Sequence, residues 1–327
     1  MVNIAIVGAG NIAKRVITAI PYTKNSCLYA IVSRNNIKAK NYREQYGAVC
    51  SYASLQEALT DKNIDLFYLC TPNQVHYDQI KACLLMGKNV MCEKPMVENA
   101  AQIKELFALA KAQHCFLMEA EKTVFTPLNT KLLEIVKAGA IGKLRAIRAD
   151  YATRVAESEL SEDHWVFDHQ FGGCAYDIGV YPICFANYFA QSTIAKIGAT
   201  AAAPKDCTDY FMGADLVYEN GVAANISSSW LWHPEDGHKG VAFLGGEKGY
   251  IVIYDYWKNN QAVLYANSKR EEITVSQESD FTGEISHASE CIENGLLESP
   301  VMGQQASLEI MKILEAIKPF KSDAPAI

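Results

Sequence analysis

The sequence lacks the features that mark membrane-spanning, nucleic-acid-binding and disulfide-bonded proteins. It has no run of about 18 apolar residues, so we expect no membrane-spanning helix. Lys and Arg form no cluster and the formal net charge is −7, which argues against a surface for nucleic-acid phosphates. The ten cysteines include no Cys-x-x-Cys pair, and Cys70, Cys92 and Cys115 lie in apolar runs, so we expect buried thiols.

Metal-ligand spacing and targeting signals are missing as well. His164, His169 and His233 follow no recognised ligand spacing, so we expect no metal site. The N-terminal residues Met1–Gly8 contain no positively charged segment and no long apolar core, and we expect a cytoplasmic protein. With 327 residues, the chain exceeds the usual size of one hydrophobic core, so two domains are expected.

Residues 1–122 alternate short apolar runs with amphipathic segments. Near-continuous apolar strands separated by helices are typical of a parallel sheet with both faces covered, so we predict an α/β, doubly wound domain. The expected strands are Asn3–Val7, Leu28–Val32, Asp65–Cys70, Asn89–Cys92 and Cys115–Met118, and the expected helices are residues 11–20, 37–46, 55–59, 74–86 and 98–112.

The pattern changes in residues 123–327, which we assign to an α+β domain for substrate binding and oligomerisation. Glu219-Asn220-Gly221 is a hairpin signal, because Asn-Gly tolerates positive φ. Hairpins predict a large, open, mostly antiparallel sheet, and we expect a homodimer or homotetramer to form through it. The expected strands are Leu144–Tyr151, Gly213–Tyr218, Val222–Trp230, Gly240–Leu244 and Tyr250–Tyr254. The expected helices are residues 128–137, 284–294 and 304–317, the last able to pack back on the first domain.

The first expected strand runs directly into Gly8-Ala9-Gly10-Asn11-Ile12-Ala13. This matches the dinucleotide-binding pattern G-x-G-x-x-G/A in its required context of strand, tight turn and helix. Gly8 permits the turn, Gly10 lets the backbone approach a pyrophosphate, and the N–H groups of Asn11 and Ile12 begin the helix that holds it. The alternative is a tight turn without a ligand. We predict a Rossmann domain that binds NAD or NADP.

The end of the second strand distinguishes between the two cofactors. An NAD site usually places a carboxylate there for the ribose 2′-hydroxyl, but this chain has Ser33-Arg34-Asn35-Asn36. The hydroxyl of Ser33 and the guanidinium of Arg34 suit a 2′-phosphate, so NADP is favoured. Arg34 as a solvated loop residue, with NAD also used, is the alternative.

Two further strand ends contribute candidates. Thr71-Pro72-Asn73 follows the third long strand and is placed to line the nicotinamide side, and His76 opens the next helix as a cofactor contact or a structural residue. Glu93-Lys94-Pro95 follows the fourth, where open α/β sheets place their ligands. Glu93 and Lys94 are therefore cofactor-binding candidates, and Lys94 can also take part in chemistry.

These segments resemble the glucose-fructose oxidoreductase / inositol dehydrogenase (Gfo/Idh/MocA) family. The matching stretches are residues 5–13, 71–76, 87–95 and Gly172-Gly173-Cys174-Ala175-Tyr176-Asp177-Ile178-Gly179-Val180-Tyr181. The resemblance implies that Lys94 is the active-site lysine and that Asp177 and Tyr181 are its second-domain partners. It is closest to the subgroup of dimeric dihydrodiol dehydrogenase and NADP-dependent D-xylose dehydrogenase. The chain departs from the family at Glu121-Lys122-Thr123-Val124, where members often carry an aromatic residue and an arginine.

Hydride transfer at a carbinol needs a group that takes or gives the hydroxyl proton. Tyr181 can serve as this general acid/base, since a nearby ammonium from Lys94 favours a phenolate whose ordinary pKa is about 10. Asp177, four residues earlier, can contact substrate or hold Lys94, or it can be a helix-capping carboxylate. Trp165 can present its face to a sugar, or it can be a buried anchor.

The predicted function is an NADP-dependent oxidoreductase acting on the hydroxyl or carbonyl group of a sugar, polyol or cyclic diol. Two alternatives stay open: a non-catalytic NADP-binding sensor, and a glycosidase- or isomerase-type enzyme that retains its cofactor. Release of reduced cofactor during turnover separates simple dehydrogenation from the second alternative.

Overall fold

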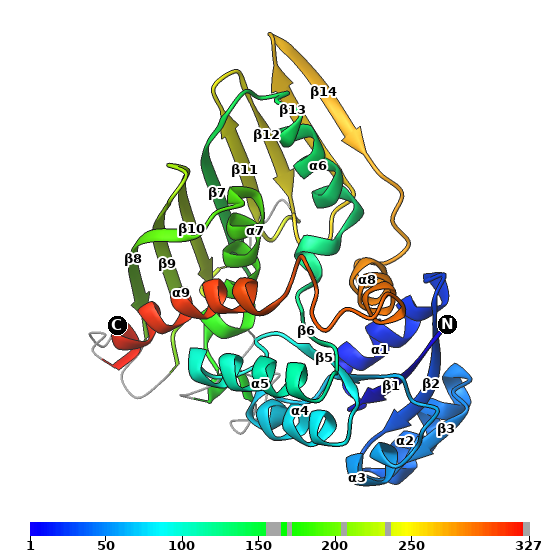
Figure 1. Ribbon diagram of the computed structural model, residues 1–327. Helices are drawn as coiled ribbons and strands as arrows, with labels where there is room; N and C mark the ends of the chain where they lie inside the picture. The colour runs from blue at the N-terminus through cyan, green and yellow to red at the C-terminus, as the bar shows by residue number, and fades with distance from the viewer. Residues whose placement is uncertain (155–164, 169–171, 204–207, 233–236, 323–327) are drawn as a thin grey trace. The chain divides into compact units, whose positions relative to one another are not determined.

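The computed structural model describes residues 1–154, 165–168, 172–203, 208–232 and 237–322. The chain divides into two compact units (Figure 1). The first unit comprises Met1–Phe125 and Glu278–Ser307, and the second comprises Thr126–Gln277 and Leu308–Ile327. Segment 278–307 therefore belongs with the first unit, whereas the sequence placed it in the second domain.

A six-stranded parallel sheet forms the core of the first unit, in the order β3-β2-β1-β4-β5-β6, with helices on both faces (Figure 1). Its central strands are apolar on both sides, as in β4, where all four residues are buried. The strands are β1 (Val2–Val7), β2 (Ser26–Val32), β3 (Cys50–Tyr52), β4 (Leu66–Leu69), β5 (Asn89–Glu93) and β6 (Leu117–Ala120). The helices are α1 (Asn11–Ala19), α2 (Asn36–Tyr46), α3 (Leu55–Leu59), α4 (His76–Leu85), α5 (Ala100–Ala112) and α8 (Thr282–Glu293).

The strand register places all the carboxyl ends of these strands at one edge. Val7 pairs with Val32 on one side and with Leu69 on the other, and Leu69 in turn pairs with Cys92. The residues that follow β1, β2, β4 and β5 therefore lie along one edge of the sheet, where ligands bind in open α/β folds.

Helix α8 joins the first unit through its apolar face and through polar contacts. Ile285, Ala288 and Cys291 are buried, and the hydroxyls of Ser26 and Ser289 lie 2.8 Å apart. Residues 294–307 also follow this unit, since Leu117 N donates to Leu297 O at 3.0 Å. The helical periodicity of the sequence predicted α8 but did not specify which sheet it would cover.

The second unit contains an eight-stranded sheet in the order β14-β13-β12-β11-β7-β10-β9-β8, antiparallel except for the pair β7–β10. The strands are β7 (Leu144–Ala152), β8 (Ile194–Ala202), β9 (Phe211–Tyr218), β10 (Ala223–Ser229), β11 (Val241–Gly246), β12 (Gly249–Tyr254), β13 (Gln261–Ala266) and β14 (Lys269–Thr274). The helices are α6 (Pro127–Lys137), α7 (Val180–Ala190) and, from Leu308 onward, α9 (Gln304–Ser322). Both parts of the predicted fold class, the doubly wound parallel sheet and the mostly antiparallel open sheet, are confirmed.

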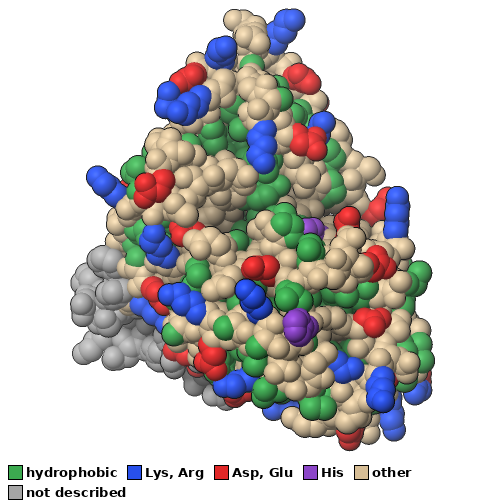
Figure 2. All heavy atoms as spheres, viewed as in Figure 1, with side chains coloured by type: hydrophobic (Ala, Val, Ile, Leu, Met, Phe, Trp, Pro, Cys, Tyr) green, Lys and Arg blue, Asp and Glu red, His purple; other side chains and the backbone are tan. Residues whose placement is uncertain are grey.

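Within the described residues, no helix is long and apolar enough to cross a membrane. On the face shown in Figure 2, side chains of both charge signs are interspersed over the surface. The nine cysteines in the described segments are free thiols.

Candidate active site

The turn after β1 has the geometry that a dinucleotide pyrophosphate requires. Gly8 has φ +104°, and a Cβ there would lie 2.7 Å from the carbonyl oxygen of Cys70, so no larger residue fits. Gly10 is different, because a Cβ there would meet nothing within 4 Å. That open space, beside the first N–H groups of α1, which no side chain caps, fits a phosphate group.

Tyr42 supports this turn from α2, a contact that no sequence motif predicts. Its buried hydroxyl donates to the carbonyl of Ala9 at 3.1 Å. A tyrosine on an amphipathic helix is normally read as core packing, and only the fold shows that it also fixes a carbonyl of the glycine turn.

The end of β2 presents a cation and no carboxylate. Arg34 is exposed, and no described residue forms a salt bridge with it. Ser33 is half-buried, and its hydroxyl accepts from the N–H of Asn35 at 3.3 Å. The Asn35 side chain in turn accepts from Lys38 N at 3.0 Å and caps α2. Arg34 is therefore the side chain here that can receive an anion.

The loop after β4 offers a buried donor. Asn73 is 8% exposed, and its Nδ2 has no partner among the described residues. Thr71 donates from its hydroxyl to Gln79 Oε1 at 2.7 Å, while Pro72 is the residue before the short 3₁₀ turn Asn73–Val75 (η2). An unpartnered buried amide at this edge fits a polar group of a bound cofactor.

His76 was predicted to be either a cofactor contact or a structural residue, and its contacts support the structural role. The ring is fully buried, its Nε2 donates to Thr71 O at 2.8 Å, and its Nδ1 lies 3.3 Å from Pro95 O. Burial lowers the pKa of His76 and so favours the neutral ring. The ring is not available for a direct cofactor contact, and it links the Thr71 loop to the turn after β5.

Glu93 ends β5 in a buried position and contacts Tyr68. The Tyr68 hydroxyl lies 2.9 Å from Glu93 Oε1 and 2.8 Å from Glu284 Oε1 of α8. One phenolic proton cannot serve two carboxylates, so one of the two carboxyls carries a proton and donates it. Burial, followed by the charge of Glu93, raises the pKa of Glu284 well above its ordinary value.

Lys94 follows Glu93, is half-buried, and precedes a cis peptide bond to Pro95. Two more buried carboxyls come from β6 and the residue after it, Glu119 and Glu121. Within the described residues, no group of three or more His, Cys, Asp or Glu is arranged to hold a metal ion.

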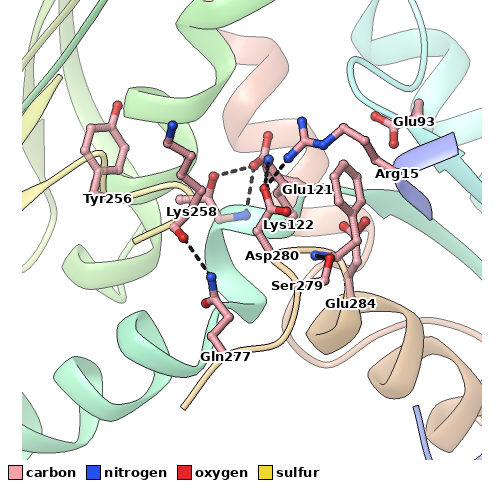
Figure 3. Close-up of polar contacts among 12 residues, drawn as sticks. Arg15, Glu93, Glu121, Lys122, Tyr256, Lys258, Gln277, Ser279, Asp280 and Glu284 are labelled. Atoms are coloured by element: carbon pink, nitrogen blue, oxygen red, sulfur yellow. Dashed lines mark hydrogen bonds and ion pairs between the residues drawn. The ribbon is translucent and has the colours of Figure 1, made fainter. Parts of the chain in front are cut away.

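The segment that departs from the family pattern forms a buried ion cluster. Lys122 is 5% exposed and pairs with Asp280, which also accepts from Arg15 at 2.7 Å. Figure 3 shows both cations directed toward this carboxylate. Lys122 Nζ and Arg15 Cζ each lie 4.7 Å from the centroid of the Phe281 ring. The sequence did not predict this cluster, because Arg15, Lys122 and Asp280 are far apart along the chain.

The second unit carries Asp177 and Tyr181 on consecutive helical turns. Residues Ala175–Gly179 form a π-helical turn (η6) that continues into α7, and Asp177 and Tyr181 are half-exposed among buried neighbours. π-Turns of this kind occur frequently at functional sites. Asp209, which is fully buried, accepts from Ala175 N at 2.8 Å in the first turn of this helix.

Tyr181 lies against an aromatic group in the second unit. Its ring centroid is 5.6 Å from that of Tyr151 and 6.1 Å from that of Trp257. Tyr151 and Trp257 stack at 3.9 Å with an interplanar angle of 10°. Trp165 begins the 3₁₀ turn Trp165–Phe167 (η5), and its side chain lies outside the described residues, as do His164, His169 and His233. The structure thus brings the cofactor candidates together in the first unit, and Asp177 and Tyr181 together in the second.

Comparison with known proteins agrees with this arrangement. Residues 2–121 match the model of the Gfo/Idh/MocA oxidoreductase family with its NAD-binding Rossmann fold, and residues 130–252 match a Gfo/Idh/MocA C-terminal domain. The chain is similar to mouse trans-1,2-dihydrobenzene-1,2-diol dehydrogenase, with 30% identity covering 95% of this chain and 94% of the relative. The enzyme of that name from Xenopus tropicalis is 30% identical over 88% of this chain and 87% of its own.

Solved structures share the whole fold at lower identity. Aldose-aldose oxidoreductase from Caulobacter crescentus superposes with a TM-score of 0.87 at 23% identity, over 98% of this chain and 97% of the other. A 3-ketoreductase from Actinomadura kijaniata gives 0.82 at 22% identity, over 97% and 96%. The chain is thus an oxidoreductase that belongs to the Gfo/Idh/MocA family, as the sequence motifs predicted.

Proposed function

We propose that this oxidoreductase is an NADP-dependent dehydrogenase that acts on a hydroxyl or carbonyl group of a sugar, polyol or cyclic diol. The observation that carries the proposal is the position of Lys94. It follows β5 at the sheet edge that also bears the Gly8–Gly10 turn and the exposed Arg34. A cation at that edge adjoins the place where the fold holds its cofactor.

The residues at this edge suit NADP. The open space at Gly10 and the uncapped start of α1 would take the pyrophosphate, and Arg34 would take the 2′-phosphate. The unpartnered Nδ2 of Asn73 and the carboxyl of Glu93 would hold the nicotinamide riboside. When bound, this cofactor supplies or accepts the hydride.

The protein's own part in the reaction is proton transfer and charge stabilisation. Tyr181 takes the proton from a substrate hydroxyl, or returns it to a carbonyl oxygen, through its phenolic oxygen. Lys94 stabilises the negative charge that develops on the reacting oxygen and on the tyrosine. Asp177, half-exposed one turn before Tyr181, accepts hydrogen bonds from neighbouring substrate hydroxyls.

The substrate class is supported by the relatives and by the aromatic group in the second unit. Two relatives at 30% identity are named for a cyclic diol. Tyr151 and Trp257 give Tyr181 an apolar flank that suits the face of a ring. The test is an assay of a panel of sugars, polyols and cyclic diols, with NADP and with NAD as cofactor. Turnover is measured by the absorbance of the reduced nicotinamide. Reduced cofactor that never leaves the protein would instead indicate an enzyme that retains it.

We also propose that a second copy of the chain covers the open face of the eight-stranded sheet. Phe243, Tyr250 and Tyr265 stack across three adjacent strands, with ring centroids 5.1 and 4.7 Å apart. Tyr250 is 38% exposed, and Tyr254 is 44% exposed. Aromatic residues grouped in this way are enriched at interfaces between subunits. Light scattering of the wild type and of Tyr250→Glu tests this: a dimer or larger oligomer that dissociates in the variant is expected, and a wild-type monomer would refute it.

A further inference from the structure

The register of β5 and β6 places the backbone positions of Lys94 and Glu121 at corresponding places. The last paired residues of these parallel strands are Glu93 and Ala120, and Lys94 and Glu121 are the residues that follow them in the two strands. Glu121 is fully buried. Each of the two residues directly follows the last paired residue of its strand. An acidic and a basic residue therefore lie at the same edge of the sheet.

The positive charge of Lys94 acts on three buried carboxyls. Burial raises the pKa of Glu93, Glu119 and Glu121, and the positive charge of Lys94 opposes that rise in each of them. Burial is the larger effect throughout, and it brings the pKa of Glu121 to about 7.

Two of these carboxyls, Glu119 and Glu93, form hydrogen bonds with other residues. Glu119 uses both of its oxygens, since Oε1 accepts from Met96 N at 2.9 Å and Oε2 accepts from Ser307 Oγ at 2.6 Å. Glu93 is joined to Tyr68.

One carboxyl oxygen of Glu121 accepts no hydrogen bond from the described residues. Its Oε1 accepts from the backbone N–H and the hydroxyl of Thr123, at 3.1 and 2.6 Å, whereas Oε2 has no partner among the described residues. A fully buried carboxyl oxygen without a hydrogen bond is costly, and such groups are retained where they have a function.

The ammonium of the adjacent Lys122 pairs with Asp280. Its charge also acts on Glu93 and Glu284 and lowers the pKa of both carboxyls. The charged groups coupled to Glu121 include Glu119 from its own strand, Lys94 and Glu93 from the end of β5, and Glu284 from α8. Lys94 is the one cation among these four.

We propose that Glu121 is a positioning residue for Lys94, whose ionised carboxylate stabilises the ammonium and whose protonation withdraws that support. This inference rests on the proposed function only in giving Lys94 a task in hydride transfer. Glu121 belongs to the segment that departs from the family pattern, so this control is a property of this chain's own residues. It gives turnover a dependence on pH near neutrality.

The first test needs no turnover. Infrared difference spectra of the cofactor-free protein, recorded across a pH series, report the C=O stretch of a protonated buried carboxyl. The band that disappears in Glu121→Gln belongs to Glu121. In Lys94→Met, this band should titrate about one pH unit higher or more, because the charge that favours the carboxylate is gone. Lys104→Met removes an exposed lysine of α5 and should leave the midpoint unchanged. An equal midpoint in Lys94→Met and the wild type would overturn the proposal.

The second test is the pH profile of turnover. The wild type should lose kcat in the oxidative direction as the pH falls through about 7, the pKa of Glu121. Glu121→Gln should lack this inflection and have a kcat lower by about tenfold or more, with little change in KM. Glu121→Asp keeps the charge and should restore the inflection. A Glu121→Gln profile that superimposes on the wild type, or differs only in KM, would contradict the proposal.

The two tests separate this inference from the proposed function. If no substrate turns over but the band shifts in Lys94→Met, the coupling of Glu121 to Lys94 stands and the proposed substrate class fails. If turnover follows the proposed function but the band does not shift, Glu121 is not a positioning residue.

Discussion

The hydroxyl of Tyr68 lies 2.8 Å from Oε1 of Glu284, in the interior of the first unit. Because the same hydroxyl also lies 2.9 Å from Glu93, this group of three holds a proton that a solvent-exposed glutamate would lose near pH 4 to 5. One of the two carboxyls beside Tyr68, Glu93 or Glu284, therefore carries a proton in the folded protein.

The shared proton makes stability fall as pH rises. A carboxyl whose folded-state pKa is raised contributes stability below its unfolded pKa, and that contribution is lost as pH rises through the folded pKa. Burial raises the pKa of Glu284 in this way. Glu284→Gln keeps a neutral hydrogen-bonding group, so it should lose less thermal stability than the wild type as the pH rises above about 5. Thermal unfolding across this range measures the difference, and parallel curves for the two proteins would refute the shared proton.

Replacing Tyr181 with phenylalanine removes the proposed acid/base and leaves the aromatic packing with Tyr151 and Trp257. We expect kcat to fall by about 10²-fold or more, with the Kd of NADPH unchanged. Tyr188→Phe is the matched control, since Tyr188 lies on the same helix two turns further along and has no proposed role. Full turnover in Tyr181→Phe would remove this residue from the mechanism.

Arg34 sets the proposed preference for NADP. A charge-assisted contact to the 2′-phosphate contributes about 1.5–3 kcal/mol, so Arg34→Ala should weaken NADPH binding by about 10- to 100-fold. Binding of NADH should not change, because it has no 2′-phosphate. Arg43→Ala, on α2 and paired with Glu44, is the control for the loss of one exposed guanidinium. Fluorescence titration measures the affinity for both cofactors. An equal loss of affinity for NADH and NADPH would show that Arg34 does not bind the 2′-phosphate.

Asp280 holds two cations, one of them buried. Burial raises the pKa of Asp280, but Lys122 and Arg15 outweigh it and hold the pKa below its ordinary value. Asp280→Asn leaves Lys122 buried without its partner and should cost about 3–5 kcal/mol of stability. The double variant Lys122→Met with Asp280→Asn should regain part of this loss, because the buried charge is gone. Chemical denaturation gives the two values, and an Asp280→Asn protein as stable as the wild type would contradict the pairing.

Most of the fold and the cofactor edge could be predicted from the sequence, because they depend on local patterns. The Gly8–Gly10 turn and the hairpin at Gly221 are short-range signals with fixed backbone requirements, and the structure has them where they were expected. Strands β3, β8, β13 and β14 were missed. The three-residue β3 is too short to show a period, and the exposed β14, Lys269–Thr274, has one buried residue.

Features that depend on contacts distant in sequence could not be predicted. The pairing of Lys122 with Asp280 spans 158 residues, and the contact of Tyr68 with Glu284 spans 216. No local pattern distinguishes such a lysine or glutamate from a solvated one. The assignment of 278–307 to the first unit has the same cause, since an apolar helical face does not state which sheet it will cover.

Hydride transfer itself is the most direct test of the proposed function. The protein would be incubated with NADP and with cyclic diols, polyols or sugars that carry deuterium on the carbinol carbon, and the nicotinamide would be examined by mass spectrometry. We predict that deuterium appears in the reduced cofactor with at least one of these substrates, and that Tyr181→Phe reduces its rate of appearance by about 10²-fold or more. If the wild-type protein binds NADP yet transfers no deuterium from any member of these classes, the proposed function is wrong.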